Sequence, residues 1–164
     1  DYKQLSERMQ KLWDKKAERL STYGNTQVEN NSPEEFYSRA GIYAEFGKII
    51  CISVGVFLKG EFRIKSFSGH DEKALLTEFA DLLNKRYNRQ EHLLCAHNGK
   101  EFDFPYMARR MLIQGITIPH ILDLSGKKPW EVSHLDTMEL WKFGDYKNYT
   151  SLDLLAAIFV IPFL

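Results

Sequence analysis

A run of apolar, mostly β-branched residues from Ile49 to Phe57 (IICISVGVF) constrains the fold more than any other feature of the chain. Apolar side chains occupy both alternating faces of this run, whereas a strand with one solvated face alternates apolar and polar residues. The pattern therefore predicts an interior strand, covered on both faces. Lys59-Gly60 predicts a turn, and Glu61–Phe67 predicts the returning antiparallel strand of a hairpin.

Helices and short strands alternate around this hairpin. Before it, the sequence predicts an amphipathic helix over residues 2–20, a polar loop over 21–32, and a helix from Ser32-Pro33 to about Tyr43 or Ala44. After it, the predicted elements are a helix over 71–86, a strand over 92–96, a helix over 103–114 ended by Gly115, weaker strands over 116–122 and 132–137, and a helix over 151–159. This order is typical of the α/β class, and 164 residues fit a single domain spanning 1–164.

Charge and hydropathy exclude several protein classes. The 22 Lys and Arg residues balance 22 Asp and Glu residues, so the chain is no polyanion-coating protein, although a nucleic-acid enzyme with a local basic patch is compatible. No apolar run approaches the ~18 residues of a membrane span, and residues 1–20 lack the apolar core of a signal peptide, so no membrane partner is expected. Cys51 and Cys95 lie in apolar runs, which predicts reduced core thiols in a cytoplasmic protein.

The strongest functional signal is the stretch from Leu94 to Arg110. A strand ends, a glycine-containing loop follows, and Asp103 stands where the next helix begins, with Pro105 just inside it. A carboxylate is thereby placed at the carboxyl end of a strand, where open α/β sheets place their sites. Mg²⁺ prefers such oxygen ligands, with other carboxylates and substrate phosphate completing its shell. The alternative is that Asp103 only caps its own helix, because aspartate is a favoured cap.

The residues Asn98–Tyr106 (NGKEFDFPY) resemble the second exonuclease motif of the DEDD 3′–5′ exonucleases. The closest likeness is to the predicted exonucleases related to the proofreading domain of B-family DNA polymerases, which occur as stand-alone bacterial proteins. The stretches 45–55, 134–140 and 151–157 are similar to other parts of this family. The resemblance implies a ribonuclease H-like mixed sheet with helices on both faces, in which the hairpin near 48–67 packs with the strands near 92–96 and 132–137.

This resemblance implies a metal-dependent exonuclease that hydrolyses phosphodiester bonds at the 3′ end of single-stranded DNA or RNA. Asp103 would be a ligand of a two-metal site that holds Mg²⁺ or Mn²⁺. Asn98 and Phe102 match the motif positions that contact the strand end, Phe102 by lying against the terminal base, with plain packing beneath the loop as the alternative. The rival function is a non-catalytic module of the same fold that binds nucleic acid or a protein partner.

The chain also departs from the family pattern. The family has four carboxylates, but no Asp-x-Glu pair lies in an apolar strand here, and the sequence ends before a late helix supplies the fourth aspartate. Only Asp103 therefore matches. We expect residues 1–164 to lack the central first strand and to be inactive alone, with residues upstream of Asp1 or a partner chain filling the gap.

Other polar and aromatic residues give weaker signals. Asp136 is a further acid that could approach the metal site, although it lies outside the motif positions. Trp130 and Trp141 are predicted to belong to the core. The basic residues of this region predict either a phosphate-facing patch or an ordinary solvated face, and they are Lys100, Arg109, Arg110, Lys127 and Lys128.

Overall fold

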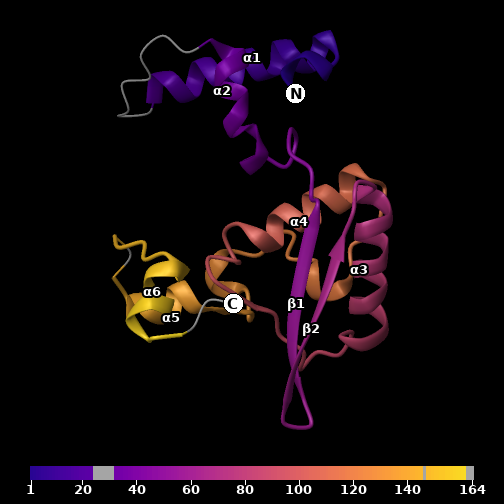
Figure 1. Ribbon diagram of the computed structural model, residues 1–164, viewed down its shortest axis with the longest axis vertical. Helices are drawn as coiled ribbons and strands as arrows, with labels where there is room; N and C mark the ends of the chain where they lie inside the picture. The colour runs from indigo at the N-terminus through magenta and orange to yellow at the C-terminus, as the bar shows by residue number, and fades with distance from the viewer. Residues whose placement is uncertain (24–31, 146, 162–164) are drawn as a thin grey trace. The chain divides into compact units, whose positions relative to one another are not determined.

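The computed structural model describes residues 1–23, 32–145 and 147–161 (Figure 1). The chain divides into two compact units, Asp1–Lys48 and Ile49–Leu164, and each is described by itself. The first unit is helical in its described part, whereas the second combines helices with small sheets, as the α/β class predicts. The expectation of one domain over residues 1–164 stays a prediction.

The first unit is organised around one buried tryptophan. Trp13 lies on α1 (Glu7–Tyr23), has no exposed surface, and donates its indole N–H to the Pro33 carbonyl at 2.7 Å. A short 3₁₀ helix, η1 (Tyr2–Gln4), precedes α1. Aromatic rings pack around Trp13 at centroid distances of 5.1–6.2 Å, and they belong to Phe36, Tyr37, Tyr43 and Phe46.

The second helix of this unit begins as predicted but changes its form early. Ser32 and Glu35 make the reciprocal bonds of a capping box at the start of α2 (Pro33–Phe36). The chain then continues as a 3₁₀ helix, η2 (Tyr37–Ile42), so the prediction of one helix to about Tyr43 was wrong in type after Phe36. Within this tighter turn, the Tyr37 ring lies edge-on against Trp13. The predicted loop over 21–32 lies mostly outside the described residues, and α1 extends to Tyr23.

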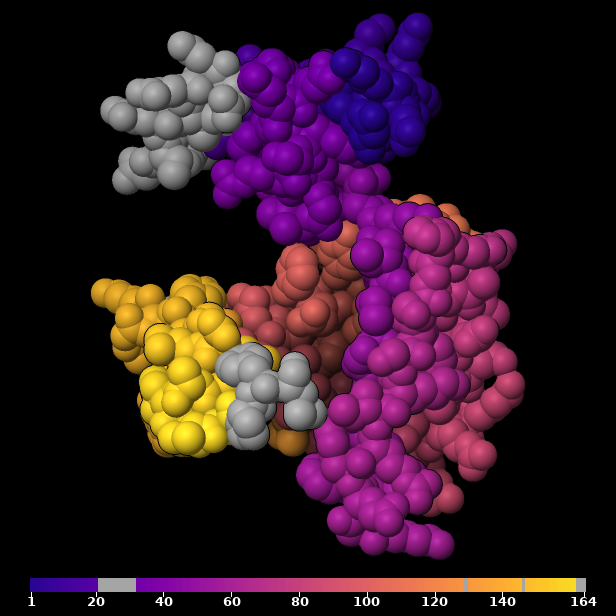
Figure 2. Space-filling view, in the orientation of Figure 1, coloured from indigo at the N-terminus to yellow at the C-terminus, as the bar shows by residue number. Residues whose placement is uncertain are grey.

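The predicted hairpin is confirmed. Strands β1 (Cys51–Leu58) and β2 (Glu61–Ser68) pair antiparallel, with register from Cys51 opposite Ser68 to Leu58 opposite Glu61. Lys59 and Gly60 both have positive φ, 52° and 85°, which is the geometry of a two-residue hairpin turn that matches the strand twist. The turn end of the hairpin extends past α3 (Glu72–Arg86) in Figures 1 and 2.

The expectation that β1 is covered on both faces was wrong within the second unit, as the structure describes it. Ile52 and Val54 point toward the core, but the alternate face is open, with Phe57 76% exposed. Across from it on β2, Phe62 is also exposed, and its ring occupies the space above Gly55. An apolar run therefore marked a strand correctly, although only one of its faces is packed.

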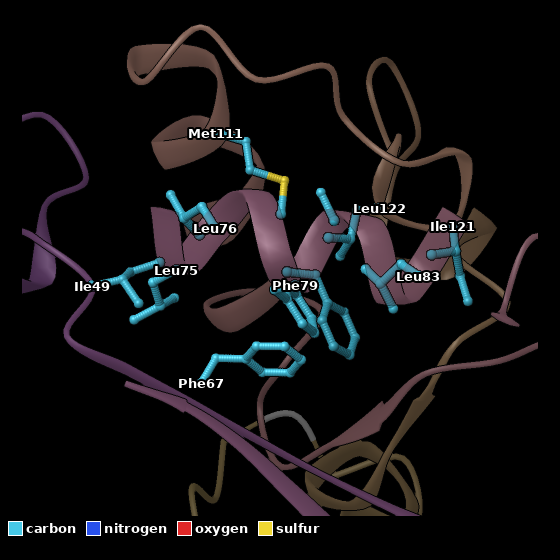
Figure 3. Close-up of a cluster of buried hydrophobic side chains, with 11 residues drawn as sticks. Ile49, Phe67, Leu75, Leu76, Phe79, Leu83, Met111, Ile121 and Leu122 are labelled. Carbon is cyan, nitrogen blue, oxygen red and sulfur yellow. The ribbon is translucent and has the colours of Figure 1, made fainter. Parts of the chain in front are cut away.

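The core of the second unit lies between α3, the inner face of β2 and α4 (Asp103–Ile113) (Figure 3). Leu76 and Phe79 of α3 are almost completely buried, and full burial of such a side chain stabilises the fold by about 1.5–3 kcal/mol. Phe67 of β2 meets Phe79 edge-on at 5.6 Å. The other buried members of this cluster are Ile49, Leu75, Ala80, Leu83, Phe104, Met111, Ile121 and Leu122.

A buried ion pair joins α3 to α4. Glu72 and Arg110 are only 4% and 6% exposed, and Arg110 donates its Nε–H to Glu72 Oε1 at 2.8 Å and an Nη2–H to Oε2. Glu72 also accepts the Ile49 backbone N–H and the Gln114 amide, both at 2.7 Å. Burial alone would raise the pKa of Glu72, but the Arg110 hydrogen bonds and those from Ile49 and Gln114 outweigh it and lower the pKa. This network fixes α4, whose first residue is Asp103.

The two remaining strands are short and form a separate sheet. β3 (Cys95–Ala96) and β4 (Leu135–Asp136) pair in parallel, so the described strands form two two-stranded sheets, one antiparallel and one parallel. The ribonuclease H-like mixed sheet, expected to lack its central first strand here, stays a prediction. The strand predicted over 116–122 was wrong: Gly115, with φ of 68°, closes α4, and Pro119 leads into the 3₁₀ helix η3 (His120–Leu122). The remaining elements are η4 (Pro129–Glu131), α5 (Thr137–Lys142) and α6 (Leu152–Ile158).

Two further expectations concerned burial. Cys51 and Cys95 are both exposed free thiols, so neither belongs to the core. Trp130 is 76% exposed and Trp141 37%, so the core assignment was wrong for both. Among the described helices, none has the length and apolar character needed to cross a membrane.

Candidate active site

The turn between β3 and α4 carries the residues singled out in the sequence. It begins at Asn98, whose φ of 62° lies in the left-handed region. The Asn98 carbonyl accepts the Phe102 N–H at 3.0 Å, and the Gly99 carbonyl accepts the Phe104 N–H at 2.9 Å. Gly99 is buried, and a Cβ built there would lie 2.5 Å from the Ala96 Cβ, so the close approach of the turn to β3 requires glycine.

Asp136 holds this turn from the end of the neighbouring strand. Asp136 is only 3% exposed. Its Oδ1 accepts the Asn98 N–H at 2.8 Å, and its Oδ2 accepts the Lys100 N–H at 3.1 Å. Oδ1 also accepts the Met138 N–H at 3.0 Å, which caps α5. One buried carboxylate therefore ties the turn to the start of α5.

Two more side chains connect the same segments. His97 places Nδ1 2.9 Å from the Thr137 hydroxyl and Nε2 2.8 Å from the Thr150 carbonyl. Lys100 reaches Glu139 of α5 with its Nζ at 2.8 Å, and its side chain is only 10% exposed. Because Lys100 is paired and Arg110 is buried against Glu72, these two residues do not form the phosphate-facing patch. Arg109, Lys127 and Lys128 are exposed.

His134 is a neutral ring that contacts the segments next to the turn. Its Nδ1 accepts the Leu94 N–H at 3.3 Å, and this bond assigns the proton to Nε2, which donates to the Ile121 carbonyl at 2.8 Å. The Phe104 ring lies edge-on against it at 5.2 Å. Burial lowers the pKa of His134 below its ordinary value and outweighs the bond to Ile121. The imidazole therefore serves packing and backbone hydrogen bonding.

Asp103 is the first residue of α4 and is exposed. The N-cap position is Phe102, whose side chain makes no cap bond, so Asp103 occupies the first helical position and not the cap position itself. Neighbouring protein atoms remove water from the Asp103 carboxyl and raise its pKa; its own backbone N–H opposes this, and the charge of Asp136 adds to the rise. Among the residues that the structure describes, no salt bridge reaches Asp103, and its carboxyl bonds its own backbone N–H.

Phe102 lies beside Asp103 with an open ring. It is 42% exposed and stands 5.5 Å from the Tyr106 ring at an interplanar angle of 35°. Asn98, at the other end of the turn, makes no side-chain hydrogen bond with any residue that the structure describes. The turn therefore brings together a free amide, an exposed aromatic ring and an exposed carboxylate.

The metal-ligating side chains of the described residues do not form a complete divalent-metal site. Among residues 1–23, 32–145 and 147–161, no three His, Cys, Asp or Glu side chains lie together as metal ligands. Asp136, the acid whose charge reaches Asp103, already accepts three backbone N–H groups. Asp103 has the oxygen chemistry that Mg²⁺ prefers, but a single carboxylate is fewer than the several oxygen ligands of such a site.

The sequence pattern predicts the turn but not how it is held. It indicates Asp136 only as an acid that could approach a metal, whereas in the structure Asp136 accepts backbone N–H groups of the turn. The pattern Asp136-Thr137-Met138-Glu139, an acid followed three residues later by glutamate, is the signal of a helix cap that could have indicated this role. The roles of His97 and Lys100 depend on contacts across about 40 residues, which no local pattern reveals.

Comparison with known protein families matches residues 42–163 to a family described as a predicted 3′–5′ exonuclease related to the exonuclease domain of PolB. The match includes all of the second unit's described elements and the turn from Asn98 to Asp103. No curated protein and no solved structure matches the chain. Because the family match covers well over half of the sequence, the chain belongs to this family of predicted 3′–5′ exonucleases related to the PolB exonuclease domain.

Proposed function

We propose that the protein is a metal-dependent exonuclease that hydrolyses phosphodiester bonds at the 3′ end of single-stranded DNA or RNA. The observation that carries this proposal is the exposed pair Phe102–Asp103 on a rigidly held turn, in a chain of this family. Asp103 would supply one carboxylate ligand to Mg²⁺ or Mn²⁺, and its raised pKa is the perturbation common among functional carboxyls. The two unpaired cysteines suit a reducing compartment, the cytoplasm.

Phe102 and Asn98 would hold the strand end. An exposed ring backed by Tyr106 offers a face on which a terminal base stacks, and such stacking contributes roughly 1–3 kcal/mol without sequence preference. The Asn98 amide has both donors and an acceptor available for the sugar or phosphate of the last nucleotide. A ribonuclease H-like arrangement of the complete sheet is part of this proposal.

A binding module is the second candidate, and the small number of metal-ligating side chains near Asp103 favours it. The described residues offer Asp103 but no group of three metal-ligating side chains. The same turn would then hold a nucleic-acid end through Phe102 and Asn98 without cleaving it. Binding without shortening of the strand separates this function from the first.

The test is an end-polarity assay on the protein at its natural length. Single-stranded DNA and RNA oligonucleotides carrying a label at the 5′ end are incubated with Mn²⁺ or Mg²⁺. The proposal predicts a ladder that shortens stepwise from the 3′ end, and a 3′ phosphorothioate linkage that delays its appearance. Asp103→Asn should abolish the ladder, while Glu101→Gln, which changes an exposed carboxylate of the same turn, should leave it intact. Bound but uncleaved strands with every metal would support the binding module instead.

A further inference from the structure

We infer that Asp136 is a positioning residue: its buried carboxylate sets the turn that carries Asn98, Phe102 and Asp103 for reaction with the strand end. The inference rests on the proposed exonuclease function, because it concerns the same turn. Asp136 itself touches only backbone N–H groups of the protein in the bonds described above.

The geometry of the bonds is what assigns this role. Asp136 Oδ1 and Oδ2 divide between Asn98 and Lys100, so the carboxylate spans the two sides of Gly99. The backbone of Asn98 is left-handed, a conformation that asparagine tolerates better than most residues with a side chain. Asp136 holds the two backbone N–H groups on either side of Gly99 from 36–38 residues away, so it is the acceptor that ties this part of the turn to β4.

The residue type also fits positioning better than capping. A cap on α5 needs one acceptor, which serine, threonine or asparagine supplies equally well. Only a carboxylate offers two acceptor oxygens with no donor, and burying it costs free energy unless several N–H groups compensate. Three backbone N–H groups do so here, two of them from the turn. Most of the hydrogen bonds that compensate the buried charge of Asp136 therefore come from the turn and not from α5.

The consequence for activity follows from the short stretch of chain between the bonds of Asp136 and the site residues. The turn runs from Asn98 directly into Phe102 and Asp103, so a change at Asn98 or Lys100 shifts both side chains relative to a bound strand. A misplacement of about 1 Å in a catalytic group costs on the order of 100-fold in rate. His97 and Lys100 reach Thr137 and Glu139 with their side chains, but Asp136 alone among these contacts bonds the turn's backbone.

The experiment compares serine substitutions at two aspartate caps, in the protein at its natural length. Asp136→Ser keeps an acceptor for Met138 but cannot bridge the turn. Asp71→Ser is the matched control, because Asp71 caps α3 through the Ala74 N–H at 3.0 Å and lies outside the turn. Rates on a labelled single strand are measured at a temperature where circular dichroism shows every variant folded. Amide exchange of Asn98, Lys100 and Met138 is followed by NMR.

We expect Asp136→Ser to lower kcat about 100-fold with a smaller change in KM, and Asp71→Ser to change kcat less than threefold. The Asn98 and Lys100 amides should lose exchange protection while Met138 retains it. Asp136→Asn, which turns an amide donor toward one of the two N–H groups, should reproduce the kcat loss if the serine variant does not fold.

Unchanged kcat in a folded Asp136 variant, or unchanged protection of Asn98 and Lys100, would overturn the inference while leaving the exonuclease function intact. A wild-type protein that shortens no strand with any metal would refute the proposed function, and the positioning inference with it.

Discussion

Replacing Glu72 by glutamine should destabilise the second unit by about 3–5 kcal/mol. The carboxylate of Glu72 accepts Ile49, Arg110 and Gln114 in a site where the residue is 4% exposed. A glutamine oxygen can replace Oε1, but its NH₂ group would then face the two donors that Oε2 serves, one from Arg110 and one from Gln114. The guanidinium stays buried without its counter-charge, and removal of one partner from a buried pair costs about this much.

The double variant Glu72→Leu with Arg110→Met tests the reasoning more sharply than the single one. Removing both charges also removes the buried unpaired ion, and such replacements are often neutral. The Ile49 N–H is nevertheless left without its acceptor, which costs about 1–3 kcal/mol. We therefore expect the double variant to lose only about 1–3 kcal/mol, less than Glu72→Gln alone.

Urea unfolding followed by far-UV circular dichroism, together with amide exchange in α3, measures these losses. Asp81→Asn is the control, because Asp81 pairs with Lys85 at 2.6 Å on the exposed face of the same helix, and loss of that pair should cost less than about 1 kcal/mol. A loss below about 1 kcal/mol for Glu72→Gln would refute the reasoning. So would a double variant as unstable as the sum of its single substitutions.

The sign of the pH dependence follows from the same network. The pKa of Glu72 is lowered in the folded state from an ordinary value of 4.5. Its contribution to stability is therefore complete above pH 4.5 and is lost as the pH falls through the folded pKa. Glu72→Gln should accordingly remove part of the acid sensitivity of the wild-type protein below that pH.

Three further substitutions test the turn and its support. His134 has a lowered pKa, so the unfolded state binds the proton more readily and stability should rise with pH up to the ordinary value of 6.5; His134→Gln should flatten this slope in thermal melts between pH 5 and about 7. Gly99→Ala should lower stability by about 1–3 kcal/mol in urea unfolding, because its Cβ has no room, whereas Gly69→Ala, with nothing within 4 Å, should cost far less; equal losses would refute the packing argument. Phe102→Ala should weaken single-strand binding by roughly 1–3 kcal/mol in fluorescence anisotropy, with little change in melting temperature. Trp130→Ala, which removes another exposed aromatic ring, is the control. An effect of Phe102→Ala no larger than that of the control would show that Phe102 is not part of the site.

Local patterns predicted much of this structure. The alternation of Glu61–Phe67 and the turn at Lys59-Gly60 predicted the hairpin, because a two-residue turn fixes its register. The apolar stripe of α3 and the Pro105 start of α4 predicted both helices within one or two residues. Apolar residues at 116 and 118 predicted a strand wrongly, because Pro119 has no N–H for a ladder and the side chains pack against the core without one.

The features that sequence could not supply are contacts between distant residues. Arg110 looked like a surface cation, and only the fold brings Glu72 to it from 38 positions away. Asp136 looked like a weak ligand candidate, and only the parallel pairing of β3 with β4 brings it to Asn98. Asp103 could be singled out because its position after a strand and before a helix is itself a local pattern.

The most direct test of the account is a paired measurement on Asp103→Asn, of exonuclease rate and of melting temperature. The raised pKa of Asp103 means that its ionised form opposes folding, so the neutral side chain should melt at the same temperature as the wild type or slightly higher at pH 7. The rate of 3′-end shortening should fall at least about 100-fold, as expected if Asp103 supplies a carboxylate ligand to the metal ion that the proposed reaction needs. A variant as active as the wild type, or one whose activity falls only together with its stability, would contradict the claim that Asp103 acts in the reaction.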